Sequence, residues 1–257
     1  MTQKVISYLN QKGGVGKSTI LFHHAHYANE MGKKVLVCDF DTQGNASTAL
    51  LGDDYQEEQF GTVGAGWLLG KQNVDEVKIA TSKNGISVIH ADESLLDVED
   101  MDIDDVVSLT GKNFELLTDF DLVLIDCPPT VGKRVIGALY ASTNVVSPIE
   151  PRKFAIDGLA SLIHTIMAVR DDRPELNFEG VVINRVNSRS PQQKRNVALI
   201  RESLGKQVFL SELVEREPIS DAVEEGVPVW SLRKSGSVTA AAREMKAVLK
   251  EIEWRLS

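Results

Sequence analysis

The stretch QKGGVGKST, residues 11–19, lies between a mostly apolar, β-prone segment at residues 5–9 and a helix-forming segment at residues 20–31 that holds no Gly or Pro. A strand, a glycine-rich loop and a helix in this order are what a phosphate-binding loop requires. Glycines let backbone N–H groups turn inward, and the helix N-terminus favours anions. The sequence therefore predicts a nucleotide site, with Lys17 on the β- and γ-phosphates and Ser18 on Mg²⁺.

The loop departs from the standard pattern G-x-x-x-x-G-K-[ST] at its first position, where Gln11 replaces glycine, and it adds a second lysine at Lys12. This variant resembles the deviant Walker-A loop of the ParA/MinD family of partitioning and positioning ATPases. The resemblance implies that Lys12 reaches across a sandwich dimer to the partner subunit's phosphates, so that ATP joins two copies of the chain. The residues that it assigns to ATP or ADP here are Lys12, Gly13, Gly14, Val15, Gly16, Lys17, Ser18 and Thr19.

A second apolar strand, residues 35–39, runs into the segment DFDTQGN at residues 39–45. Carboxylates at the C-terminal end of a buried parallel strand point into the crevice where such sheets bind ligands. The pattern resembles the family's switch I, which implies that Asp41 helps to activate the attacking water, and we assign Asp39 to Mg²⁺. The family more often has Pro at Thr42, a departure that should leave the chemistry intact. Taken alone, the two aspartates would fit helix capping or a solvated turn.

Residues 121–126, DLVLID, combine four apolar residues with a terminal carboxylate. This is typical of a Walker-B strand, in which the carboxylate, here Asp126, holds Mg²⁺, usually through water. The D-x-P-P pattern that follows resembles switch II of the same family. Its prolines stiffen a loop that must move as one piece when the γ-phosphate arrives or leaves, and we assign Pro129 to the nucleotide site.

Two further segments are assigned to the adenine base by the resemblance alone. Asn184 and Arg185 follow a predicted strand at residues 178–183, and Asn184 matches the residue that hydrogen-bonds the adenine edge in the family. A cap at the end of the strand is the alternative for Asn184. On the other side of the base the family's usual proline is missing, and Val214 and Glu215 stand there.

Apolar segments alternate with helix-forming segments along the whole chain, and this predicts an α/β fold with a doubly wound, mostly parallel sheet. A length of 257 residues fits a single P-loop ATPase domain spanning residues 1–257. The predicted strands are residues 5–9, 35–39, 86–90, 121–126, 144–149, 178–183 and 207–210. Helices are expected at residues 20–31, 62–69, 154–170 and 237–256, and one that ends near residue 118.

Composition places the chain among ordinary globular proteins, with 42% hydrophobic and 25% charged residues. Cys38 and Cys127 lie in or beside apolar strands without metal spacing, and we expect both to be reduced in a cytoplasmic protein. No signal peptide fits before the loop, and no apolar run is long enough to span a bilayer. We expect the short form of the family, without a helix-turn-helix segment before the loop.

The formal net charge of −9 is unevenly spread. Residues 92–105 hold eight acidic residues and no Lys or Arg, which favours a solvated acidic face over a docking site for a basic partner. Residues 184–206 are basic, and charges act only over about 8 Å at physiological salt, so this local patch matters more than the total. The resemblance implies sequence-independent DNA binding in the ATP state, and a solvated helix face is the alternative for each residue. The candidates are Arg185, Arg189, Lys194, Arg195, Arg201, Arg233 and Lys234.

The last predicted helix has an apolar stripe formed by Met245, Val248, Leu249, Ile252 and Leu256. In the MinD branch of the family a C-terminal amphipathic segment binds the membrane instead of the sheet. Glutamates at 251 and 253 interleave with the stripe here, and aromatic and basic residues are few. We therefore expect the helix to pack on the sheet, and we do not expect membrane binding.

Three histidines, His23, His24 and His26, lie on the helix after the loop. Zinc would need further ligands, and neither His90 nor His164 is placed by the sequence to supply them. We expect these histidines to serve helix packing and the helix surface.

The motifs predict ATP hydrolysis used as a conformational timer, and the resemblance implies that it is slow, is stimulated by a partner and moves a plasmid, a chromosome or a protein cargo. The resemblance implies a ParB-like centromere-binding or adaptor protein as the stimulating partner, and association with the nucleoid in the ATP form. A MinD-like positioning ATPase and a metabolic ATP-dependent ligase on the same fold are the alternatives. An iron-protein-type reductase is rejected, because Cys38 and Cys127 do not stand where cluster ligands would be needed.

Overall fold

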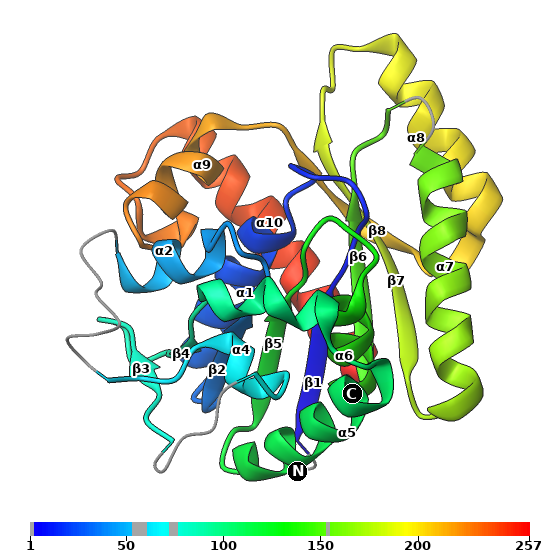
Figure 1. Ribbon diagram of the computed structural model, residues 1–257. Coiled ribbons are helices and arrows are strands. Elements are labelled where there is room, and N and C mark those ends of the chain that lie inside the picture. The colour runs from blue at the N-terminus through cyan, green and yellow to red at the C-terminus, as the bar shows by residue number, and fades with distance from the viewer. Residues whose placement is uncertain (1–2, 53–60, 72–76, 153–154) are drawn as a thin grey trace.

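The computed structural model describes residues 3–52, 61–71, 77–152 and 155–257. An eight-stranded sheet runs through the middle of the molecule in the order β3-β4-β2-β5-β1-β6-β7-β8 (Figure 1). Its strands pair in parallel, except that β3 is antiparallel to β4. The strands are β1 (Lys4–Tyr8), β2 (Val35–Asp39), β3 (Ala80–Thr81), β4 (Ser87–Ile89), β5 (Leu122–Asp126), β6 (Asn144–Ile149), β7 (Asn177–Val186) and β8 (Val208–Val214).

Helices cover both faces of the sheet, which confirms the doubly wound α/β fold (Figure 1). One face carries α1 (Lys17–Glu30), α2 (Asn45–Leu51), α9 (Glu217–Glu224), the 3₁₀ turn η5 (Val229–Ser231) and α10 (Gly236–Leu256). The other carries α4 (Ala65–Leu68), α5 (Ile103–Phe114), α6 (Lys133–Ala141), α7 (Ala155–Asp172) and α8 (Pro191–Leu204). Short 3₁₀ turns complete the chain at η1 (Glu93–Leu95), η2 (Asp97–Asp100), η3 (Glu115–Leu117) and η4 (Gly205–Gln207).

The central strand β1 shows why the sheet has two cores. Its side chains alternate, so that Ile6 and Tyr8 enter the core under α1 and α10, whereas Val5 and, just past the strand, Leu9 enter the core under α5 and α6. All four side chains are buried. Such burial on both faces is what a continuous apolar strand followed by a helical crossover requires. It brings the C-terminal ends of β1, β2 and β5 to one edge of the sheet.

Two expected strands are longer in the structure, and β3 has no counterpart among the expected strands. The strand expected at residues 178–183 runs from Asn177 to Val186 as β7, because it pairs with β6 on one side and β8 on the other. The strand expected at residues 207–210 continues to Val214 as β8. Asn184, Arg185 and Val214 therefore belong to strands and do not follow them.

The outer side of β8 is bonded to the side chains of two helices. Glu251 of α10 accepts hydrogen bonds from the backbone N–H groups of Leu210 (2.7 Å) and Ser211 (2.8 Å). Arg201 of α8 donates to the carbonyls of Phe209 (2.8 Å) and Leu210 (3.2 Å). These four backbone groups, at residues 209–211, are thus satisfied by side chains and need no further strand.

The C-terminal helix α10 packs on the sheet, as expected. Its apolar stripe, which is Met245, Val248, Leu249, Ile252 and Leu256, is buried in the core that it shares with α1. The interleaved Glu253 accepts a hydrogen bond from His24 (2.9 Å) and pairs with Lys33. No helix among the described residues is long and apolar enough to cross a bilayer.

The three histidines of α1 are all buried, so the packing role is confirmed and the surface role is wrong. His24 also contacts the Tyr8 hydroxyl through Nδ1 (2.7 Å), which joins β1, α1 and α10. Burial lowers the pKa of His23 and of His26 to about 4. Among the described residues no group of three or more His, Cys, Asp or Glu side chains is arranged to hold a metal ion.

Candidate nucleotide site

The glycine-rich loop connects β1 directly to α1. Gly14 (φ +75°) and Gly16 (φ +95°) adopt left-handed conformations that side chains disfavour, and Gly16 caps α1. Lys17 is the first residue of the helix and only 6% exposed, whereas Lys12 is exposed. The loop therefore presents N–H groups, a helix N-terminus and a nearly buried cation to one space, as anion binding requires.

Asn184 and Arg185 hold this loop from β7. The Nδ2 group of Asn184 donates to the Val15 carbonyl (2.7 Å), and a Cβ atom on Gly16 would lie 2.1 Å from it. Arg185 has a left-handed backbone (φ +54°) and donates to the Gly14 carbonyl (2.7 Å). Both residues predicted to bind the base thus donate to carbonyls of the phosphate loop, and their role toward adenine stays a prediction.

The other pair predicted for the base lies next to β7. Val214 pairs with Val186, and the Glu215 N–H donates to the Val186 carbonyl (3.1 Å). Val214 also donates to Glu244 (3.4 Å). Backbone pairing accounts for the position of this segment, and its contact with a base stays a prediction.

Three carboxylates meet at the ends of β2 and β5. Asp39 and Asp126 are paired in the sheet and fully buried, and Asp41 is 8% exposed. Burial first, and then the charge of Asp41, raises the pKa of Asp39 to about 6. Burial and the charge of Asp39 also raise the pKa of Asp126, against the effects of Ser18 and Lys17. Burial and the mutual repulsion of these carboxylates thus both disfavour the charged forms of Asp39 and Asp126 in the nucleotide-free protein.

The residues present fit a magnesium ion. Ser18 donates to Oδ2 of Asp126, and Oδ1 of Asp126 is a buried oxygen with no hydrogen-bond partner among the described residues. A hydroxyl, an unpaired carboxylate oxygen and phosphate oxygens form the hard ligand set that Mg²⁺ prefers. Asp39, unlike Asp126, already has partners within the protein, because it accepts hydrogen bonds from the N–H and hydroxyl of Ser47 (both 2.8 Å). Its predicted role as a magnesium ligand stays a prediction.

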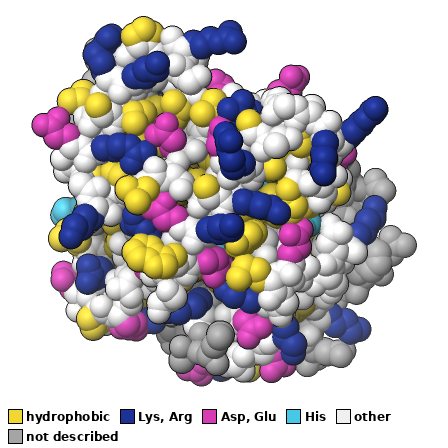
Figure 2. Space-filling view, turned by 180° about the vertical axis from the view of Figure 1, so that it is seen from behind, with side chains coloured by type: hydrophobic (Ala, Val, Ile, Leu, Met, Phe, Trp, Pro, Cys, Tyr) yellow, Lys and Arg dark blue, Asp and Glu magenta, His cyan; other side chains and the backbone are white. Residues whose placement is uncertain are grey.

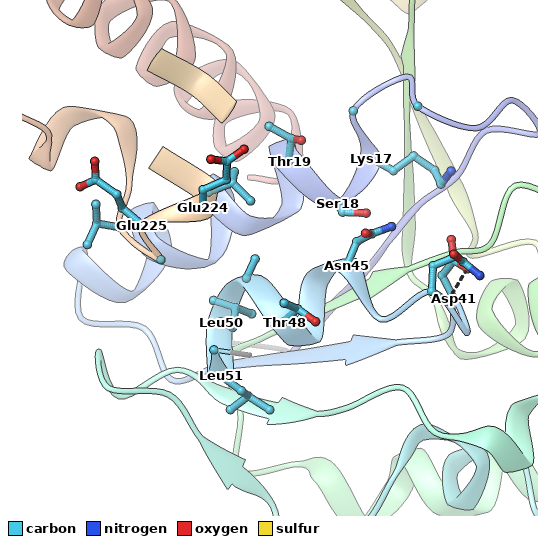
Figure 3. A pocket seen from close by; sticks show the side chains of 18 of the residues that line it. Lys17, Ser18, Thr19, Asp41, Asn45, Thr48, Leu50, Leu51, Glu224 and Glu225 are labelled. Atoms are coloured by element: carbon cyan, nitrogen blue, oxygen red, sulfur yellow. Dashed lines mark hydrogen bonds between the residues drawn. The ribbon is translucent and has the colours of Figure 1, made fainter. Parts of the chain in front are cut away.

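A cavity of about 1000 Å³ opens over the loop. Figure 3 shows Lys17, Ser18 and Asp41 on one side of it and Glu224 and Glu225 of the α9 end on the other. The cavity is large enough for a nucleotide. Among the predicted site residues, its lining contains Gly13, Gly14, Gly16, Lys17, Ser18, Thr19, Asp41, Pro129 and Arg185.

Comparison with known proteins places this site in a family. A family model described as an AAA domain matches residues 3–178. Protein IncC of Escherichia coli is 34% identical over 255 residues, which are 96% of this chain and 68% of IncC. The chromosome partitioning protein ParA of Caulobacter vibrioides is 31% identical over 248 residues, which are 91% of this chain and 90% of ParA. The chain belongs to the ParA/MinD family of ATPases.

Solved structures share the fold of this ParA/MinD-family chain. A plasmid partition protein of Borrelia burgdorferi B31 bound to AMPPNP has a TM-score of 0.80 at 22% identity, covering 98% of this chain and 99% of that one. Cobyrinic acid a,c-diamide synthase of Mycobacterium smegmatis, with a bound ATP analogue and magnesium, has a TM-score of 0.75 at 24% identity, covering 98% and 96%. Proteins of this fold therefore bind adenine nucleotides and magnesium.

The basic residues predicted to bind DNA in this ParA/MinD-family chain lie in two segments. One runs from the end of β7 into α8, and Figure 2 shows Lys and Arg side chains projecting at that tip of the molecule, at the top of the view. The second, between η5 and α10, holds Arg233 and Lys234. Arg201 is the exception in accessibility, since it is half-buried and also pairs with Glu212 (3.0 Å). The other candidates are exposed: Arg185, Arg189, Lys194, Arg195, Arg233 and Lys234.

Sequence reasoning missed several residues that support the site. Ser47 holds Asp39, and Glu150, at the end of β6, pairs with Arg185 (3.3 Å). The sequence does place Ser47 in the helix directly after switch I, and this position was the available signal. Nothing in the sequence marks Glu150, since its partner lies 35 residues away. Both cysteines are free and buried, as expected.

Proposed function

We propose that this chain is an ATP-dependent, dimerising partition ATPase whose hydrolysis step releases it from DNA. One observation carries the proposal: Lys17, Ser18 and Asp41 line a single cavity, and Ser18 is bonded to the buried Asp126, in a chain whose relatives include a chromosome partitioning ParA. Such a cluster fits phosphoryl transfer, in which catalysis consists almost entirely of positioning and electrostatic stabilisation.

Each residue of the site has a separate role that follows from its position. Lys17 and the loop N–H groups bind the β- and γ-phosphates and stabilise the charge that develops on them. Ser18 and Asp126 would hold Mg²⁺, which neutralises phosphate charge when bound. Asp41, at the end of β2, orients the attacking water and accepts its hydrogen bond. Asp39, bonded to Ser47, fixes the start of switch I.

Dimerisation is proposed to depend on Lys12. It is exposed on the same loop that carries Lys17, so its side chain is free to reach a second subunit's phosphates. The test is light scattering of the hydrolysis-deficient Asp41→Ala variant with ATP, alone and combined with Lys12→Ala. We expect dimers for the first and monomers for the second. Monomers in both would remove the sandwich dimer from the proposal.

DNA binding is proposed for the ATP dimer through phosphate contacts without base readout. If five phosphates are neutralised per subunit, the slope of log K against log salt is about −4 to −5 per subunit. Filter binding with ATP, with ADP and without nucleotide measures this slope. A slope near zero in ATP would reject DNA binding. In the cell such binding would place the ATP form on the nucleoid, in the cytoplasm.

A ParB-like centromere-binding or adaptor protein is the proposed stimulating partner, and a plasmid, chromosome or protein complex the cargo. The basal rate is then slow and rises with partner and DNA. ATP turnover with DNA and with the protein of the adjacent reading frame tests this stimulation. An unchanged rate with both would remove that partner from the proposal.

The two rival functions are tested against structural observations. A MinD-like membrane role is disfavoured because the apolar stripe of α10 is buried, and liposome sedimentation with ATP decides it. A metabolic ligase shares the fold, as the synthase structure shows. It would not need Lys12, so Lys12→Ala separates it from a partition ATPase.

A further inference from the structure

The peptide between the two aspartates of switch I is fixed at both ends. The N–H of Phe40 donates to the Asp126 carbonyl (2.9 Å), and the carbonyl of Phe40 accepts from Nη1 of Arg134 (3.3 Å). That carbonyl belongs to the same peptide unit as the N–H of Asp41, which donates to Oδ1 of Asp39 (3.2 Å). Because a peptide unit is planar, a bond to one end orients the other. Arg134 thus holds the unit from which Asp41 projects.

Arg134 is itself held in place. It lies in the first turn of α6, is 8% exposed, and donates from Nε to Oε1 of Glu99 (3.0 Å). The second oxygen of Glu99 accepts from the Lys133 N–H (2.8 Å). A Cβ atom on Gly132 would lie 2.5 Å from that oxygen, so glycine lets the carboxylate reach the helix start. Burial opposes ionisation of Glu99, but these hydrogen bonds outweigh it and lower the pKa of Glu99.

The hydrogen bonds of Arg134 connect switch I with the helix after switch II and with η2. Glu99 belongs to η2 in the acidic segment, Arg134 to the helix that follows switch II, and Phe40 to switch I. Arg134 is not among the described residues that line the cavity. Arg134 therefore acts on the site through the groups that it contacts, and of these the Phe40 carbonyl is the one in switch I.

We propose that Arg134 is a positioning residue for ATP hydrolysis: it fixes the peptide that carries Asp41 and so directs that carboxylate toward the attacking water. The inference rests on the proposed function, in which Asp41 orients the water. An arginine is required because its planar fork serves Glu99 and the Phe40 carbonyl at once, which a single ammonium group does not.

The first test is Arg134→Met, with kcat, KM and the affinity for a fluorescent non-hydrolysable ATP analogue measured together. We expect kcat to fall by about 10- to 100-fold, as misplacement of a reacting group by about 1 Å does, with analogue affinity within about twofold. Arg134→Lys should recover part of the loss, and Glu99→Gln should show a smaller loss. A wild-type kcat in Arg134→Met overturns the inference, and so does an equal loss of kcat and affinity.

A matched control is Arg173→Met. Arg173 donates to the Tyr140 carbonyl at the other end of α6, so its loss disturbs the same helix away from the site. We expect Arg173→Met to lower the melting temperature without lowering kcat. If Arg173→Met lowers kcat as much as Arg134→Met does, the effect is structural and the inference fails.

A double-mutant cycle separates this inference from the proposed function. If Arg134 acts through Asp41, adding Arg134→Met to Asp41→Asn lowers kcat no further, whereas independent effects multiply. Multiplying effects overturn the inference and leave the role of Asp41 intact. A wild-type kcat in Asp41→Asn alone overturns the proposed function instead. Glu99→Gln gives the same cycle if Arg134→Met does not fold.

Discussion

The two halves of the sheet end in different ways at the cavity. Lys17 and Asp41 lie on the segments that follow β1 and β2, and the buried Asp126, one of whose oxygens is unpaired among the described residues, ends β5. At β6 and β7 the polar side chains Asn184 and Arg185 find partners in the chain itself. The first half therefore reserves polar groups for a ligand, and the second supports the loop that will hold it. The substitutions below test this contrast in order of expected effect.

The largest effect is expected at Lys17, in the half that binds the ligand. Lys17→Ala removes a nearly buried cation from the phosphates, so kcat/KM for ATP should fall by about 10³-fold or more. Steady-state kinetics and nucleotide affinity measure the loss. A loss below tenfold would mean that the phosphates bind elsewhere.

Asp41→Asn should act on the chemical step alone. It keeps the side-chain shape and its hydrogen bond with the Gln43 N–H but weakens the acceptor for water, so kcat should fall by about 10²- to 10⁴-fold. ATP affinity should stay within a few fold. Single-turnover hydrolysis with a parallel binding assay separates the two. A variant that loses binding as strongly as hydrolysis contradicts this assignment.

Asp126→Asn should stabilise the nucleotide-free protein by about 1–2 kcal/mol while weakening the dependence of ATP hydrolysis on magnesium. Burial and the charge of Asp39 raise the folded-state pKa of Asp126, so the folded state binds a proton more readily than the unfolded state. The free energy of unfolding of the wild type then falls as pH rises from the pKa of Asp126 in the unfolded state to its raised pKa in the folded state. The advantage of the variant should therefore be larger at pH 8 than at pH 4, as urea titrations would measure. An equal advantage at both pH values would contradict a charge effect.

The smallest effect on activity is expected in the supporting half. Asn184→Ala leaves the buried Val15 carbonyl without its partner, which costs about 1–3 kcal/mol of stability. Hydrolysis should fall less than tenfold when ATP is saturating. Thermal denaturation and kinetics on one preparation compare the two effects. If ATP affinity falls more than a hundredfold, Asn184 contacts the base directly.

The residues of the ligand-binding half could be predicted from the sequence more directly than those of the supporting half. Lys17, Ser18, Asp41 and Asp126 follow short local patterns, because glycine loops and strand-end carboxylates are readable from neighbouring residues. Asn184 was found by resemblance only, and its partner at Val15 lies 169 positions earlier.

The strand order, the strand lengths and the long-range hydrogen bonds depend on packing across the sheet, and the sequence alone did not predict them. The strand order was implied only as doubly wound, and β7 exceeded its expected length because two neighbours pair with it. The bonds from Arg134 to Glu99 and Phe40 join residues 35 and 94 positions apart. No local periodicity records such contacts.

The side chains along the outer side of β8 limit how copies of this protein associate. Glu251 and Arg201 occupy the backbone groups of residues 209–211 in the middle of β8, and this interrupts the template that the margin would offer to an incoming strand. We therefore do not expect copies of this protein to continue the sheet from one molecule to the next at this margin. The same side chains protect it against edge-to-edge aggregation when the protein is concentrated.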